Sequence, residues 1–263
     1  MSSEQLKRQA NDIPSSNSLS QPLRENPPKL SGITISLWVL WAVYVYILLL
    51  SPTGQIIGGE PVWDIQPHTI QEAFNESVNF YFILPILNGL GINYRIAPWV
   101  HPVSQGLFNF AEAWMLMFLP LLLADSQGNK LPKVGFWGLA MFLTNVFLIP
   151  YMALRSAALP DEKVLPYNKG LISKVLGLIG LFVGCVSLIW GCIAFPESGN
   201  IAERGHYFLT LLMSDRLTIA FGVDLVLFWL FQVILLGDVI PGDSKLRWLR
   251  FIPFGGLAIW LLE

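Results

Sequence analysis

The chain has 263 residues, of which 54% are apolar and only 13% charged, and its formal net charge is -2. Soluble domains carry about 25% charged residues, so this composition indicates a membrane protein. Without clusters of Lys and Arg among aromatic residues, it gives no indication of a nucleic-acid partner. Cys185 and Cys192 lie in one apolar run, about 10 Å apart on a helix, too far to bridge. A disulfide framework and a thiolate metal site within one chain are therefore excluded.

Residues 1–32 are polar and rich in Ser and Pro, which predicts a disordered tail before a transmembrane helical domain over 33–263. About 20 apolar residues are needed to span the ~30 Å hydrocarbon layer. Five runs meet this length: 33–50, 103–124, 134–154, 171–195 and 217–236. Two further runs are marginal: 74–91, which holds several polar residues, and 248–262, which is short.

The distribution of Lys and Arg decides between topologies, because cytoplasmic loops are enriched in these residues. If all seven runs cross, twelve basic residues lie on the tail side and four on the other. If 74–91 only dips into the membrane, the split becomes eight and eight. We therefore expect an all-α bundle of about seven transmembrane helices, with a cytoplasmic tail and the C-terminus on the opposite side. The loop 51–73, which has no Lys or Arg, then faces outward.

Small residues form a stripe along the run 171–195. They are spaced 3, 4, 3 and 4 residues apart: Gly177, Gly180, Gly184, Ser187 and Gly191. Such a stripe lets two helix backbones approach closely in lipid, where no hydrophobic force drives helix association. The partner is either another helix of the same chain or another membrane subunit.

Two acids lie deep in long apolar runs: Glu112 in the run 103–124 and Asp224 in the run 217–236. The amides that accompany them inside the apolar runs are Asn88, Asn109, Asn145 and Gln232. Ionisable residues in the membrane are costly and usually face the protein interior. Two interpretations remain open. Either these residues line a path for a proton, a cation or a small solute, or they form interhelical hydrogen bonds that fix helix packing.

A second polar stripe begins the marginal run and is formed by Glu72, Asn75, Glu76 and Asn79. It indicates either a cavity mouth or a solvated helix end. The three histidines are isolated in loops or at run ends, so a pigment ligand is conceivable but not indicated. No phosphate-binding loop, serine elbow or zinc motif is present, and we expect no catalytic residue, metal or cofactor.

Four segments resemble an uncharacterised family of polytopic membrane proteins from cyanobacteria and chloroplasts. They read FNESVNFYFILPILN, APWVHPVSQGLFNFAEAWMLMFLPLLLAD, MFLTNVFLIPYMALR and SDRLTIAFGVDLVLFWLFQ. The resemblance covers the chain from Ile33 onward and involves no catalytic motif. It implies a thylakoid or plasma membrane. The short tail, with acids at Glu4, Asp12 and Glu25, is unlike a transit peptide and favours the cyanobacterial branch.

Two functions follow as expectations. The first is a non-enzymatic accessory, assembly or organising factor in a photosynthetic membrane, with the lipid bilayer and other membrane subunits as partners. The small-residue stripe and the lack of catalytic groups favour it. The alternative is a transporter or channel that uses Glu112 and Asp224.

Overall fold

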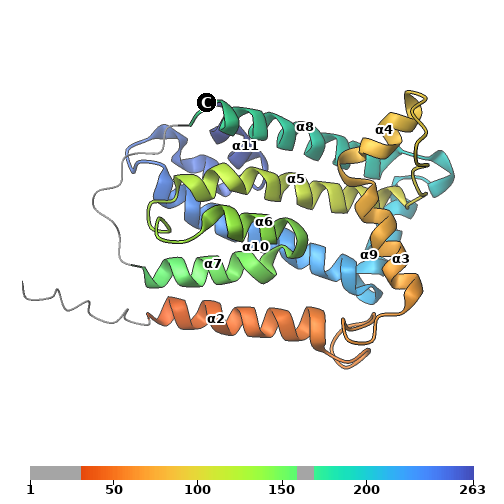
Figure 1. Cartoon of the computed structure of the whole chain (residues 1–263), viewed down its shortest axis with the longest axis horizontal. Coiled ribbons are helices and arrows are strands. Elements are labelled where there is room, and N and C mark those ends of the chain that lie inside the picture. The colour runs from red at the N-terminus through yellow and green to blue at the C-terminus, as the bar shows by residue number, and fades with distance from the viewer. Residues whose placement is uncertain (1–30, 159–168) are drawn as a thin grey trace, which may run out of the picture.

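The computed structural model describes residues 31–158 and 169–263. Every regular element in these residues is a helix, which confirms the all-α prediction (Figure 1). The prediction of a disordered tail over 1–32 falls mostly on residues 1–30, outside the described residues; of the other two, Ser31 caps the first helix and Gly32 begins it.

Four helices are long and apolar enough to cross a membrane. They are α2 (Gly32–Val45) with its π-helical continuation η1 (Tyr46–Leu50), α5 (Pro102–Ala124), α8 (Leu171–Ile193) and α10 (Arg216–Val239). All four run along the long axis of the molecule in Figure 1. They match four of the five confident runs to within three residues at each end. The finer prediction of about seven crossings is not confirmed.

Local signals fix where these helices begin. The Ser31 hydroxyl caps α2 by accepting the Thr34 backbone N–H at 3.2 Å. The Asp215 carboxylate caps α10 by accepting the Thr218 backbone N–H at 2.7 Å. Pro102 occupies the first turn of α5, where the missing backbone N–H costs nothing. These contacts satisfy N–H groups that have no partner inside their own helix.

The expectation of a straight crossing over 134–154 is wrong. The run forms two short helices, α6 (Lys133–Leu143) and α7 (Asn145–Ala157), separated by Thr144 at φ 36°. The Phe136 and Tyr151 ring centroids lie 5.7 Å apart, whereas 15 residues of straight helix would separate them by about 22 Å. The two helices therefore form an antiparallel hairpin with Thr144 at its tip, and α6 and α7 lie next to each other in Figure 1.

The base of this hairpin is held by the buried Arg155, which pairs with the buried Asp125 and the more exposed Asp238. The Arg155 side chain donates to Asp125 at 2.7 Å and to Asp238 at 2.5 Å, which ties α7 to the ends of α5 and α10. The Tyr151 hydroxyl donates to the same Asp125 carboxylate at 2.6 Å. Both arms of the hairpin thus start at the end of the bundle where α5 and α10 finish.

The run 248–262 also turns back on itself. It comprises η4 (Lys245–Phe251) and α11 (Gly255–Leu262), separated by Phe254 at φ 56°. The Lys169 ammonium, just before α8, donates to the Trp260 backbone oxygen at 2.6 Å. The chain therefore ends at the end of the bundle where α2 begins (Figure 1), and the expectation of a C-terminus on the opposite side is wrong.

The opposite end of the bundle is covered by shorter elements: α3 (Pro67–Val78), η2 (Phe80–Phe82), α4 (Ile83–Gly89), η3 (Pro196–Ser198) and α9 (Ile201–Ser214). In Figure 1, α3 crosses this end steeply instead of following the long helices. Tyr81 and Phe82 both have positive φ, so the run 74–91 is broken at its centre. This end holds three basic residues, Arg95, Arg204 and Arg216.

Helix α5 is the core of the bundle. It packs against α6, α8 and α10, and Met115, Phe118 and Leu121 on it are fully buried. In contrast, α2 and α8 leave large apolar side chains exposed, among them Val39 and Phe182.

Candidate functional site at the tip of the α6–α7 hairpin

Asp224, near the middle of α10, receives three side-chain hydrogen bonds from other elements. The Tyr44 hydroxyl donates at 2.6 Å, the Thr144 hydroxyl at 2.6 Å and the Asn145 amide at 2.7 Å. Asp224 is 2% exposed. The carboxylate therefore joins α2, the hairpin tip and α10 at one buried point.

The hairpin tip offers Asp224 an electrostatically favourable position. Thr144 is the N-cap of α7, and Asn145 is its first residue. Helix N-termini carry partial positive charge and stabilise anions. No Lys, Arg or His forms an ion pair with Asp224 in residues 31–158 or 169–263. Neutral donors and a helix terminus thus hold this acid.

Glu112 on α5 is the second buried acid and is bound less completely. It is 5% exposed, and its Oε2 atom has no hydrogen-bond partner among the described residues. The Tyr81 hydroxyl donates to the Glu112 backbone oxygen at 3.2 Å, not to its side chain. Glu112 and Asp224 are close enough for their charges to interact. Asp224 therefore has hydrogen-bond donors on both carboxylate oxygens, whereas Glu112 has an oxygen without a partner among the described residues.

Asn109 holds the broken run 74–91 against α5. Its Oδ1 atom accepts the Tyr81 backbone N–H at 2.5 Å, and its Nδ2 atom donates to the Asn79 and Gln105 backbone oxygens at 3.4 and 3.0 Å. These bonds satisfy backbone groups that the positive-φ break releases.

Gln232 and Asn88 have separate roles. Gln232 accepts a hydrogen bond from the Trp114 indole at 3.0 Å and donates to the Ile252 backbone oxygen at 2.7 Å. It therefore holds the tip of the second hairpin, which is formed by η4 and α11. Asn88 lies in α4 at the end of the bundle and binds Ala97 and the Arg95 backbone. It therefore lies in a short helix, outside the four long helices and apart from the other amides.

The small-residue stripe of α8 faces helices of the same chain. A Cβ atom added at Gly177 would lie 2.8 Å from Leu261, and one at Gly106 of α5 would lie 2.7 Å from the Ser187 backbone oxygen. At the same face, Gly180 meets Met117, Gly184 meets the Phe254 ring and Gly191 meets Pro102 and Val103. The stripe thus packs on α5 and the second hairpin, and it offers no free surface to another subunit.

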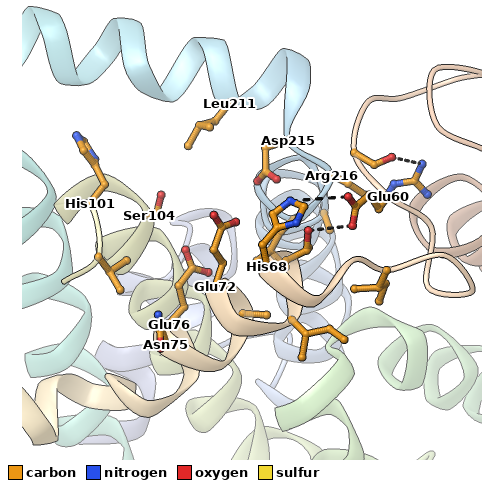
Figure 2. Close-up of a pocket in the computed structure, with 18 of the residues that line it drawn as sticks. Glu60, His68, Glu72, Asn75, Glu76, His101, Ser104, Leu211, Asp215 and Arg216 are labelled. Atoms are coloured by element: carbon orange, nitrogen blue, oxygen red, sulfur yellow. Dashed lines mark hydrogen bonds and ion pairs between the residues drawn. The ribbon is translucent and has the colours of Figure 1, made fainter. Parts of the chain in front are cut away.

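A cavity of about 780 Å³ opens between α3, α9 and the outer ends of α5 and α10 (Figure 2). Figure 2 shows the carboxylates of Glu72, Glu76 and Asp215 reaching into the same space. Asn75 also lines the cavity, so three of the four residues in the stripe of α3 form a cavity wall. Asn79 does not line it and is instead buried beneath it, at 1% exposure.

Charge in the cavity is predominantly acidic. Burial, followed by the charges of Asp215 and Glu72, raises the pKa of Glu76 to about 7. Burial and the nearby Arg204 lower the pKa of His101. Within the described residues, no group of three or more His, Cys, Asp or Glu side chains is arranged to hold a metal ion. The cavity therefore presents a carboxyl group that titrates near neutrality.

The sequence pattern missed two residues of the site, Tyr44 and the hydroxyl of Thr144. Tyr44 is a single hydroxyl in an apolar run, and Thr144 precedes an amide in another. Their roles depend on the hairpin, which places residue 144 at the bundle centre.

Neither protein-family models nor curated proteins nor solved structures gave a match to this chain.

Proposed function

We propose that this chain is a non-enzymatic membrane protein that moves a proton, a cation or a small polar solute through a site formed by Asp224 and Glu112. One observation carries the proposal. A helical hairpin enters the bundle from one end, turns at Thr144, and places the tip side chains on Asp224.

Hairpins of this kind are costly in a bilayer. Irregular backbone at membrane depth is tolerated only where protein buries it or where it lines a water-filled space. Transport proteins use such breaks to present helix ends to ions or substrates near the bilayer centre. A buried acid at the break suggests the same use here, because ionisable residues inside membranes commonly mark ion or substrate paths.

The charge distribution supports an orientation. We propose that the four long helices span the membrane and that both hairpins enter it from the cytoplasmic side. Eight described Lys and Arg residues lie at the hairpin end: Lys130, Lys133, Arg155, Lys169, Lys174, Lys245, Arg247 and Arg250. Only three lie at the cavity end. The positive-inside rule then makes the hairpin end cytoplasmic and the cavity end external or lumenal.

An accessory role in a photosynthetic membrane is the second candidate. The exposed apolar faces of α2 and α8 favour it, because they suit either lipid or another membrane subunit. The small-residue stripe no longer favours it, since that stripe contacts α5 and the second hairpin. The resemblance to a family of cyanobacteria and chloroplasts remains the reason to expect this location.

Flux in proteoliposomes tests the proposal. Uptake of H⁺, Na⁺ and K⁺ is measured for the unmodified protein, for Glu112→Gln and for Asp224→Asn. Glu197→Gln is a matched control, because Glu197 is an exposed carboxylate at the cavity end of the bundle. We expect a flux that both buried-acid variants abolish and the control retains. Equal flux in all four proteins, or none above empty liposomes, would contradict a transport role for these acids.

A further inference from the structure

Three buried side chains beneath the cavity carry polar atoms without partners among the residues that the structure describes. They are Asn79 Oδ1, Gln105 Nε2 and Glu112 Oε2, on residues that are 1%, 2% and 5% exposed. Buried polar atoms in proteins are nearly always hydrogen-bonded to protein or to ordered water. Three such atoms in one region therefore indicate a place where water is held.

Helix spacing and one hydrogen bond place these residues between the cavity-lining residues and Glu112. Gln105, Asn109 and Glu112 follow the i, i+4, i+7 spacing of one face of α5. Asn79 is one helical turn from the cavity-lining Glu76, and its backbone oxygen accepts from Asn109 at 3.4 Å. One turn places side chains about 5–6 Å apart, a gap that single water molecules bridge. Two such gaps separate Glu76 from Asn79 and Asn109 from Glu112, and the hydrogen bond from Asn109 to Asn79 fixes the two amides between them, where they can position water.

Aromatic rings pack together on α5 just below the cavity. Phe108 packs edge to face against Phe221, with ring centroids 5.8 Å apart, and also against Phe80 at 6.3 Å. Phe108 lies one turn deeper on α5 than the cavity-lining Ser104. Any entry from the cavity toward Glu112 therefore passes beside these packed rings, along the polar face of α5.

We propose that protons enter this protein from the cavity and reach Glu112 through water held at Asn79 and Gln105. The inference rests on the proposed transport function and names the proton as the species that uses the site. The amides do not titrate; they position the water that carries the proton.

The transfer step is balanced. The Glu76 carboxyl group gives its proton to the first water, and the last water gives a proton to the Glu112 carboxylate. Glu76 becomes a carboxylate, Glu112 becomes a carboxylic acid, and the waters are unchanged. Glu72 from α3, Asp215 at the start of α10 and His101 at the start of α5 share the cavity with Glu76. Its pKa of about 7 lets Glu76 exchange protons with water at neutral pH.

Proton flux and isotope exchange test the inference together. Proton flux is measured in liposomes that contain a pH-sensitive dye, with K⁺ and valinomycin present to clamp the membrane voltage. The proteins compared are the unmodified protein, Glu76→Gln, Asn79→Leu and Glu197→Gln. We expect Glu76→Gln and Asn79→Leu to lower the flux by about tenfold or more. Glu197→Gln should leave it unchanged. Infrared spectra at acidic pH also follow H/D exchange of the Glu112 carboxylic acid band, identified by its loss in Glu112→Gln.

The outcomes separate this inference from the proposed function. A flux that needs Glu112 but is insensitive to both Glu76→Gln and Asn79→Leu would overturn the inference and leave transport intact. A protein without any flux would overturn the proposed function, and the infrared band then decides the inference. Exchange slowed by Asn79→Leu supports a water path from the cavity. If the Glu112 band exchanges equally fast in the unmodified protein and in Asn79→Leu, or does not exchange in either, the water path is overturned. Size-exclusion profiles establish that each variant is folded.

Discussion

Replacing Asp224 with Leu should loosen the α6–α7 hairpin from the rest of the bundle. The substitution removes one acceptor from three buried donors, on Tyr44, Thr144 and Asn145. Interhelical hydrogen bonds in membrane proteins contribute about 0.6 kcal/mol each on average, which would give about 2 kcal/mol in total. Hydrogen bonds to a charged group contribute about 1.5–3 kcal/mol each, which would give about 5 kcal/mol or more. Because the three donors also remain buried without an acceptor, the measured loss should not fall below about 2 kcal/mol.

Reversible unfolding in mixed detergent micelles, followed by circular dichroism, measures this loss. Asp224→Asn is the matched control. It keeps an acceptor for the Tyr44 and Asn145 donors, which share Oδ1, and should cost only about 1–2 kcal/mol. Unchanged stability in Asp224→Leu would refute the conclusion that this acid holds the hairpin tip.

Three other substitutions test separate parts of the structure. Gly184→Val should destabilise the protein by about 1–3 kcal/mol, because the added side chain meets the Phe254 ring. In the same unfolding assay Gly138→Ala, in helix α6 with open space around it, should stabilise the protein by about 0.5–1 kcal/mol. Because the pKa of Glu76 is raised from 4.5 to about 7, its favourable contribution is complete below pH 4.5 and is lost as the pH rises through 7. Stability should therefore fall by about 3 kcal/mol between these values, at about 1.4 kcal/mol for each pH unit by which the pKa is raised, and Glu76→Gln should remove that slope in unfolding measured across pH. Arg155→Leu should cost about 3–5 kcal/mol, because it leaves a buried Asp125 carboxylate without its cation, and a cost below 1 kcal/mol would contradict the buried pair.

The long helices were predictable because apolar length alone defines them. Runs 103–124 and 171–195 correspond closely to α5 and α8, and breaker residues lie at their ends. The run 134–154 has the same apolar length, yet it turns back at Thr144. Hydropathy measures how apolar a segment is and contains no information on the direction of the chain. A hairpin buried in protein and a straight crossing therefore give the same hydropathy profile. No Gly or Pro lies at the turn, and the positive φ of Thr144 has no sequence signature.

The second hairpin had a local signal that length obscured. Pro253, Gly255 and Gly256 lie where η4 ends and α11 begins, and such residues commonly mark a break. Of the candidate site, Glu112 and Asp224 were predictable because acids are conspicuous in apolar runs. Their partner Tyr44 was not, since its role depends on a contact 180 residues along the chain.

Sidedness of the hairpin base tests the central structural claim most directly. Single cysteines are introduced at Lys130 and Ala158, which lie at the base of the two hairpin arms, in a chain with Cys185→Ala and Cys192→Ala. Vesicles of one orientation are then treated with a membrane-impermeant maleimide from each side in turn. A hairpin predicts that both positions react from the same side, and that a cysteine at Glu197 reacts only from the other. Labelling of positions 130 and 158 from opposite sides would show a straight crossing, and the placement of Thr144 on Asp224 would be wrong.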